Sequence, residues 1–321
     1  MRDACEPARS ARRPWLPVRV LWGIGLSFFR TTHLADLRVG RFSMRDAHRY
    51  IVRHFVWPYY SRRSRGEVMF RGQRMAVPDD ADSLGFLMGT FESQTCEFIE
   101  RSIEEGMIVV DAGANIGFYS LLAARRVGPK GRVYAFEPEA ANFALLMRNI
   151  GLNGYRNIRA LPAALAESTR RVALYLSRES CGSHSIYRDA AVGSGSVEVE
   201  AVSFDEFWEA EGRPEIGFIK MDIEGAEAAA LEGMSNFLEA TRRLTMITEF
   251  FPGALRAAGT KPESYLRGLS ALGFQVQFFI GEGLVSLESV DMASLYGRLG
   301  DEYGVNLLCT KTPASGEGAS I

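Results

Sequence analysis

The sequence predicts an α/β fold: a doubly wound, mainly parallel, seven-stranded sheet with an N-terminal helical, arginine-rich extension. From residue 107 onward, short apolar runs alternate with segments of helical periodicity, as in strands joined by crossover helices. The apolar runs lack polar alternation, which indicates parallel strands with both faces covered. Positive charge is concentrated at the start of the chain, which sets that part off from the sheet.

The extension is recognised by its charge. Residues 1–75 hold 16 arginines, no lysine and five acids, a net charge of +11, while the remaining 21 basic and 34 acidic residues give −13. This asymmetry indicates a basic arm, partly disordered and partly helical, over residues 1–80. Because aromatic residues and the apolar run 20–29 are interleaved with its arginines, three roles stay open: a helical cap, a peripheral contact with a membrane or lipid-linked glycan, and, least favoured, nucleic acid binding.

The predicted elements begin with a hairpin over residues 67–77, which turns at Arg71-Gly72. Seven strands are predicted at residues 107–112, 132–137, 157–163, 216–222, 244–250, 273–280 and 304–310. Helices are predicted at residues 92–106, 118–127, 139–150, 225–238 and 262–272.

Residues 165–203 interrupt this alternation, because two segments of period two flank a loop rich in glycine and serine. They predict a hairpin inserted into the main domain. The main domain then spans residues 81–312, and residues 313–321 form a loose tail.

Cysteine and histidine usage argues against several kinds of site. The four cysteines are scattered without a C-x-x-C pair, and only His184 of the four histidines lies beyond residue 60. We therefore expect no disulfide framework and no metal site, and a reducing, cytoplasmic location fits. The apolar run 20–29 is shorter than the roughly 20 residues of a spanning helix. A membrane contact would thus be peripheral, at the inner surface.

The stretch VVDAGANIGFYS, residues 109–120, places an acid and two glycines where the first strand meets a helix. Gly113 allows a sharp turn close to a ligand, and Gly117 lets the helix pack near the strand. The spacing is D-x-G-x-x-x-G and not the G-x-G-x-x-G of pyrophosphate binders. Asp111 would repel a phosphate and suits an ammonium group. Read alone, the two glycines could also be ordinary turn residues.

The stretch VYAFEPE ends the second strand with Glu137, 20 residues after Gly117. An acid at this place can accept hydrogen bonds from both hydroxyls of a ribose. A solvated acid before a proline is the simpler alternative. Together, Asp111 and Glu137 predict a nucleoside with a cationic amino-acid tail, which is S-adenosylmethionine.

The stretch FIKMDIEGAE gathers charges at the end of the fourth strand, beside the first-strand turn. Transfer of a methyl group to a hydroxyl requires removal of its proton, and Asp222 is the first candidate for that base. Glu224 and Glu227 could instead stabilise the start of the next helix. Lys220 fits better as a salt-bridge partner of these acids than as a catalytic group.

Two further candidates for catalysis are weaker. Glu249 ends the fifth strand and could face the substrate or belong to a buried network, and His184 lies in the inserted loop and titrates near neutrality. The acids could alternatively hold a divalent cation that lowers the pKa of the acceptor hydroxyl, which we do not favour.

VVDAGANIGFYS, AFEPEAANFALLMRNIGLN and FIKMDIEGAEAAALEGM together resemble the FkbM family of S-adenosylmethionine-dependent methyltransferases, over roughly residues 85–285. The resemblance implies a class I, Rossmann-like methyltransferase sheet and O-methylation of a sugar, glycan or natural-product hydroxyl. It implies that Asp222 faces the transferred methyl group. It also implies cofactor contacts, by position, for Glu92, Asp111, Gly113, Asn115, Gly117, Glu137, Asn142 and Ala164.

Two other functions stay open. A nucleotide-sugar or dinucleotide-using enzyme on the same fold would want G-x-G-x-x-G and a Tyr-x-x-x-Lys pair, which we do not find. A non-catalytic binding module would keep the sheet and use the arm to dock a partner. The intact acids at the strand ends favour the enzyme.

Overall fold

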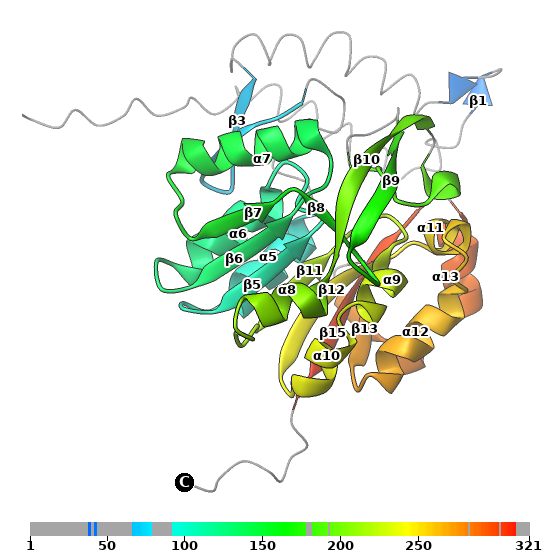
Figure 1. The fold of residues 1–321 in the computed structure, drawn as a ribbon. Helices are drawn as coiled ribbons and strands as arrows, with labels where there is room; N and C mark the ends of the chain where they lie inside the picture. Colours follow the sequence, from blue (N-terminus) through cyan, green and yellow to red (C-terminus); the bar gives the residue numbers. More distant parts are fainter. Residues whose placement is uncertain are drawn as a thin grey trace, which may run out of the picture. The chain divides into compact units, whose positions relative to one another are not determined.

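The computed structural model describes residues 38–39, 42–43, 66–78, 92–177, 182–191, 193–281, 283–301 and 303–312 (Figure 1). The chain divides into two compact units, Met1–Phe91 and Glu92–Ile321. The rest of the arginine-rich extension, the apolar run 20–29 and the tail 313–321 lie outside the described residues.

In the first unit, the predicted hairpin is confirmed. Strand β3 (Glu67–Phe70) pairs antiparallel with β4 (Gln73–Ala76), and the turn falls at Arg71 and Gly72, which both have positive φ angles. Two further short strands, β1 (Arg38–Val39) and β2 (Phe42–Ser43), also pair antiparallel.

The second unit is built on an eight-stranded sheet of order β14-β13-β15-β12-β11-β5-β6-β7. Its strands are β5 (Ile108–Ala112), β6 (Arg132–Phe136), β7 (Ile158–Leu161), β11 (Phe218–Met221), β12 (Leu244–Phe250), β13 (Gln275–Ile280), β14 (Gly283–Ser286) and β15 (Val305–Lys311). From β7 to β12 neighbouring strands run parallel, whereas β15, β13 and β14 each pair antiparallel.

The seven predicted strands are therefore confirmed, and β14 is an eighth that pairs with β13. The strand order reverses between β5 and β11, so the sheet has a topological switch point there. Ligands of doubly wound sheets bind at such a point, beyond the carboxyl ends of the strands. The order and strand directions are those of the class I fold that the sequence predicts.

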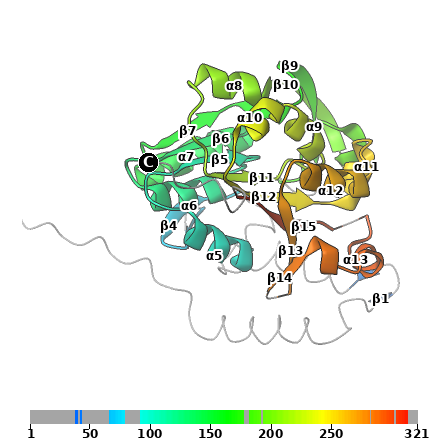
Figure 2. The ribbon, with the colours of Figure 1, turned by 90° about the horizontal axis from the view of Figure 1, so that it is seen from below.

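Helices cover both faces of this sheet. They are α5 (Ser93–Ser102), α6 (Phe118–Val127), α7 (Ala140–Asn153), α8 (Phe204–Ala210), α9 (Glu227–Glu232), α10 (Ser235–Ala240), α11 (Pro252–Ala257), α12 (Pro262–Ala271) and α13 (Met292–Leu299). Figure 2 shows α5 and α6 on one side of the sheet and α8, α9 and α10 on the other. Buried aromatic side chains fill the space beneath the latter, with ring centroids of Phe204 and Phe237 5.1 Å apart.

The single helix predicted over 225–238 is wrong in one respect, because it is two helices, α9 and α10, separated at Gly233. A Cβ atom at Gly233 would lie 2.0 Å from the carbonyl oxygen of Ala166. The backbone of a distant segment thus lies against the chain at the point where the helix breaks.

The predicted strand 157–163 ends earlier than expected, at Leu161, and a new strand, β8 (Ala163–Ala166), follows Pro162. It pairs parallel with β10 (Gly193–Ser203), which pairs antiparallel with β9 (Arg170–Ser177). The predicted hairpin within 165–203 is therefore confirmed as part of a separate three-stranded sheet.

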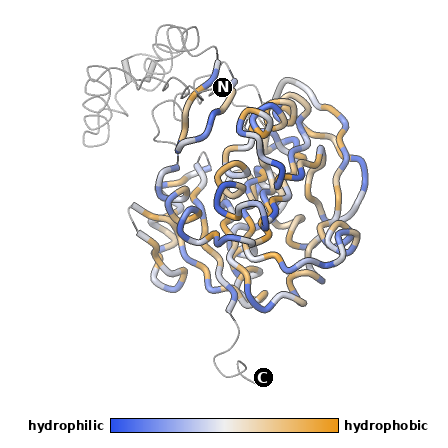
Figure 3. The backbone as a smooth tube through the Cα atoms, turned by 90° about the vertical axis from the view of Figure 1, so that its left-hand side faces the viewer, coloured by the Kyte–Doolittle hydropathy of each residue, from blue (hydrophilic) through white to orange (hydrophobic). Residues whose placement is uncertain are grey.

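Hydrophobic and hydrophilic stretches alternate along the second unit (Figure 3). Among the helices of the described ranges, none combines the length and the hydropathy needed to cross a membrane.

Candidate functional site

The turn after β5 depends on glycine at two positions. Gly113 has φ +78°, and a Cβ atom there would lie 1.9 Å from the carbonyl oxygen of Asp222. Gly117 has φ +93°, and its Cβ would lie 2.6 Å from Cδ1 of Leu146. A side chain at either position would be strained and would clash with its neighbour. Gly113 therefore lets the backbone after β5 approach the backbone after β11, and Gly117 lets the start of α6 pack against Leu146 of α7.

Asp111 is the last but one residue of β5 and has a buried carboxylate. Oγ of Ser120 donates a hydrogen bond of 2.5 Å to its Oδ2, while Oδ1 is buried and receives no hydrogen bond from the described part of the chain. Burial raises the pKa of Asp111 to about 6, although the Ser120 hydrogen bond and the charge of Lys220 oppose the shift. A buried acceptor without a donor is costly, so this oxygen suits a ligand that brings one.

Glu137 follows β6 and is only 5% exposed. The backbone N–H of Asn115 donates to Oε2 (2.7 Å) and that of Glu139 to Oε1 (2.8 Å). Burial raises the pKa of Glu137 to about 7, against the effect of these two donors. A hydrogen bond from the Asn142 side chain also lowers this pKa, and since a carboxylate has about four acceptor positions, at least one is left for a ligand donor.

The other predicted cofactor residues lie in three places. Asn142 is buried in the first turn of α7, where its backbone N–H donates to Oε2 of Glu139 (2.7 Å). Ala164 lies in β8 and pairs with Ala201 of β10. Glu92 directly precedes α5 and accepts hydrogen bonds from the hydroxyl of Tyr119 (2.5 Å) and from Nδ2 of Asn306 (2.7 Å).

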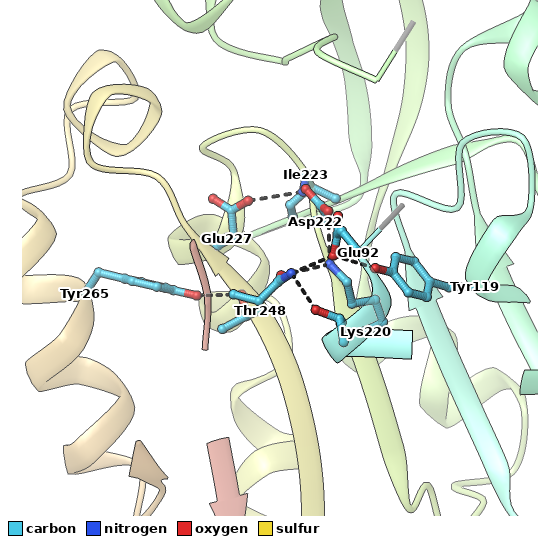
Figure 4. A network of polar contacts seen from close by, with 10 residues as sticks. Glu92, Tyr119, Lys220, Asp222, Ile223, Glu227, Thr248 and Tyr265 are labelled. Carbon is cyan, nitrogen blue, oxygen red and sulfur yellow. Dashed lines mark hydrogen bonds and ion pairs between the residues drawn. The ribbon is translucent and has the colours of Figure 1, made fainter. Parts of the chain in front are cut away.

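Lys220 is the buried cation of the site, 1% exposed in the middle of the sheet. Its Nζ forms an ion pair of 2.9 Å with Oδ2 of Asp222 and lies 3.4 Å from Oδ1 of Asn306 and 5.2 Å from the ring centroid of Tyr119 (Figure 4). Burial by itself lowers the pKa of Lys220, but the charges of Asp222 and Glu92 outweigh it and hold the pKa above its usual range. Lys220 is therefore a permanent cation.

Three carboxylates gather at the ends of β11 and β12. Oxygens of Asp222, Glu224 and Glu249 lie within 4.8 Å of one another. Burial, followed by the charge of Asp222, raises the pKa of both Glu224 and Glu249 well above its usual range, since several negative charges in one place are unfavourable. Carboxylates this close can hold a divalent cation, but such groups are also common without one, and we assign no metal here.

Glu227 lies next to this group and is buried at the first residue of α9. Its Oε1 accepts the backbone N–H of Ile223 (3.1 Å), and burial raises its pKa to about 7 (Figure 4). It thus fixes the turn that follows β11, in agreement with a structural role.

His184 lies in the inserted loop, with its Nδ1 accepting the backbone N–H of Ser177 (3.0 Å). Burial lowers its pKa, so the imidazole is neutral near pH 7 and the hydrogen-bond pattern assigns its proton to Nε2. The next residue, Ser185, donates to the carbonyl oxygen of Glu224 (2.7 Å). The inserted loop therefore borders the segment that carries the carboxylates.

Sequence reasoning missed two members of the site, Tyr119 and Asn306. Tyr119 lies inside the first motif, but its hydroxyl donates a hydrogen bond to Glu92. Helix α5 separates Glu92 from that motif in the sequence. Asn306 is a polar residue directly before the apolar residues Leu307, Leu308 and Cys309 of β15, and the register of β12 and β15 pairs it with Glu249. The polar residue in that strand was the available signal.

Comparison with known proteins gives a consistent result. The sequence profile described as "Methyltransferase FkbM domain" matches residues 111–276. "Methyltransferase 1" of Beauveria bassiana is 25% identical over 146 residues, which are 40% of this chain and 58% of that protein. The hexuronic acid methyltransferase AglP of Haloferax volcanii is 27% identical over 149 residues, 46% of this chain and 58% of AglP. The chain thus spans less than two thirds of each of these relatives.

Among solved structures, a Streptococcus mutans protein described as a methyltransferase, in complex with SAH, is similar at a TM-score of 0.40. It is 10% identical, and the match covers 68% of this chain and 97% of that protein.

Proposed function

The chain belongs to the FkbM methyltransferase family, whose profile matches more than half of it, and from this premise we propose that it transfers the methyl group of S-adenosylmethionine to a hydroxyl of a sugar, glycan or natural-product acceptor. One observation carries the proposal. Asp111 and Glu137, both buried at the ends of adjacent parallel strands, flank the glycine turn at the switch point of the sheet.

The residues present fit this cofactor. The unsatisfied Oδ1 of Asp111 suits the ammonium group of the methionine moiety, and the two oxygens of Glu137 suit the two ribose hydroxyls. At Gly113 the Asp222 carbonyl leaves no room for a side chain, which keeps the turn between the two acids tight. The same acids disfavour a dinucleotide, because its pyrophosphate would face a carboxylate at the turn.

Asp222 is the proposed base. When bound, the cofactor supplies an electrophilic methyl group on a positively charged sulfur. The side chain of Asp222 is 29% exposed, and its Oδ2 forms the ion pair with Lys220. Among the described residues, no donor is bonded to its Oδ1, so we propose that this oxygen takes the proton of the acceptor hydroxyl. Glu249 holds its proton more tightly than usual. We propose that Glu249, like Nε2–H of His184, donates a hydrogen bond to the acceptor.

The acidic side chains of the site favour an acceptor whose hydroxyl has no negatively charged group beside it. Asp222 lies where the acceptor would enter, and its carboxylate would repel a carboxylate or phosphate there. AglP is named for a hexuronic acid. We propose that this chain instead favours neutral or amino-bearing scaffolds.

The experiment that tests the proposal has two stages. Isothermal calorimetry with S-adenosylhomocysteine comes first, and a folded sample that binds none refutes the proposal. The second stage incubates the protein and S-adenosylmethionine carrying a deuterated methyl group with neutral glycans, amino sugars, uronic acids and natural-product extracts. Mass spectrometry then identifies the labelled product. Tight binding of S-adenosylhomocysteine without labelling of any acceptor would favour the non-catalytic alternative.

A further inference from the structure

A lysine in the middle of β11 needs an explanation. Lys220 is flanked in register by Asp111 of β5 and Ile247 of β12, and its side chain is as buried as those of the apolar residues around it. Burying an ammonium group is costly unless it is paired and hydrogen-bonded. The role of Lys220 should therefore be sought in the groups that its ammonium contacts.

Three protein groups engage Nζ. An ammonium group has three N–H donors. Asp222 and Asn306 accept two of them, and the face of the Tyr119 ring lies within cation–π distance of the nitrogen. The raised pKa keeps the proton on Lys220, which argues against its acting as an acid or a base.

Asn306 is itself held in one orientation. Its Oδ1 faces the ammonium group of Lys220, while its Nδ2 donates to Oε2 of Glu92 (2.7 Å) and to Oγ1 of Thr95 (3.2 Å). Reversing the amide would place two donors against Lys220 and an acceptor against Glu92, so the assignment follows from its neighbours. A continuous polar chain thus runs from Glu92, before α5, to Asp222, after β11.

We infer that Lys220 is a positioning residue, which, held by Asn306, fixes Oδ2 of Asp222 so that the other carboxylate oxygen stays available for the proton of the acceptor. This inference rests on the proposed function of Asp222. It assigns Lys220 an effect on turnover that acts only through Asp222, with no contact of its own to the cofactor or the acceptor.

The test is a double-mutant cycle on the acceptor identified by the labelling panel. Lys220→Met keeps the length of the side chain and removes its charge. We expect kcat to fall about 100-fold, because a base misplaced by about 1 Å loses that much rate, while the KM for the acceptor and the affinity for S-adenosylhomocysteine change little. Adding Lys220→Met to Asp222→Asn should slow the enzyme no further. The matched control is Lys311→Met, whose wild-type Nζ donates to the carbonyl of Leu238 outside the proposed site, and it should leave kcat within about twofold.

Two outcomes would overturn the inference. One is an additive cycle, in which Lys220→Met lowers kcat by the same factor in the Asp222→Asn variant as in the wild type. Additivity would indicate that Lys220 has a general structural role. The other is a crystal structure of Lys220→Met with S-adenosylhomocysteine in which the Asp222 carboxylate keeps its place. The crystal structure needs no acceptor. It therefore tests the inference even if the labelling panel finds no acceptor and the proposed function fails.

Discussion

The affinity for S-adenosylhomocysteine should depend steeply on pH, because the two carboxylates proposed to hold it have raised pKa values. Burial brings the pKa of Glu137 to about 7 and that of Asp111 to about 6. Ribose hydroxyls and an ammonium group both interact best with the ionised forms. Ligand binding should therefore release protons, and affinity should rise with pH and level off above the pKa of Glu137.

The size of the effect follows from these two values. At pH 8 both groups are largely ionised, whereas at pH 5.5 about 3% of Glu137 and about a quarter of Asp111 carry a charge. If only the doubly ionised site binds, Kd rises about 100-fold between the two conditions, or about 2.7 kcal/mol. Most of this change belongs to Glu137.

Calorimetry in buffers of different ionisation enthalpy measures both Kd and the protons released. The Glu137→Gln variant serves as the comparison, because it removes the larger contribution and should leave only about a fourfold dependence from Asp111 over the same range. A Kd that stays constant from pH 8 to pH 5.5 in a folded wild-type protein, with no proton release, would refute the assignment of these two acids to the ligand.

Three further predictions concern single substitutions. Gly113→Ala should abolish binding of S-adenosylhomocysteine and lower Tm, because the new Cβ would overlap the Asp222 carbonyl. The control Gly151→Ala lies on an open helical surface and should be neutral or stabilising by up to about 1 kcal/mol. Equal effects of the two variants in calorimetry and thermal unfolding would contradict this expectation. Asp222→Asn should keep the affinity for S-adenosylhomocysteine within about threefold but reduce kcat at least about 100-fold, and an unchanged rate excludes it as the base. The pKa of Glu249 is raised in the folded state, so its tendency to ionise as pH rises lowers the stability of the folded protein. Glu249→Gln should therefore raise Tm at pH 8 but not at pH 4. A Tm gain of the same size at both pH values would show that the charge of Glu249 is not the cause.

The sheet could be predicted because its strands carry their own signal. A parallel strand buried on both faces is a short apolar run, so β12 was located to the residue and β5, β6 and β11 to within one or two. The break at Gly233 could not be predicted, because the carbonyl of Ala166, which lies against the chain there, is far away in the sequence. Short helices such as α11 and α13 have too few turns to show a clear periodicity.

The candidate site divides in the same way. Asp111, Glu137 and Asp222 could be singled out because each follows an apolar run, and parallel strands place such residues at one edge of the sheet. Asn306 depends on an antiparallel register between β12 and β15 that the apolar pattern does not specify. Local sequence thus revealed the acids and not the amide that connects them.

The close approach of Gly113 to the Asp222 carbonyl has a consequence for protein engineering. The segments proposed to recognise the donor and to activate the acceptor share a backbone junction there, so we expect a change on either side of it to affect both functions. Attempts to redirect the enzyme toward new acceptors should leave that junction untouched and diversify the inserted loop around Ser185, whose side chain meets the carboxylate-bearing segment through one hydrogen bond.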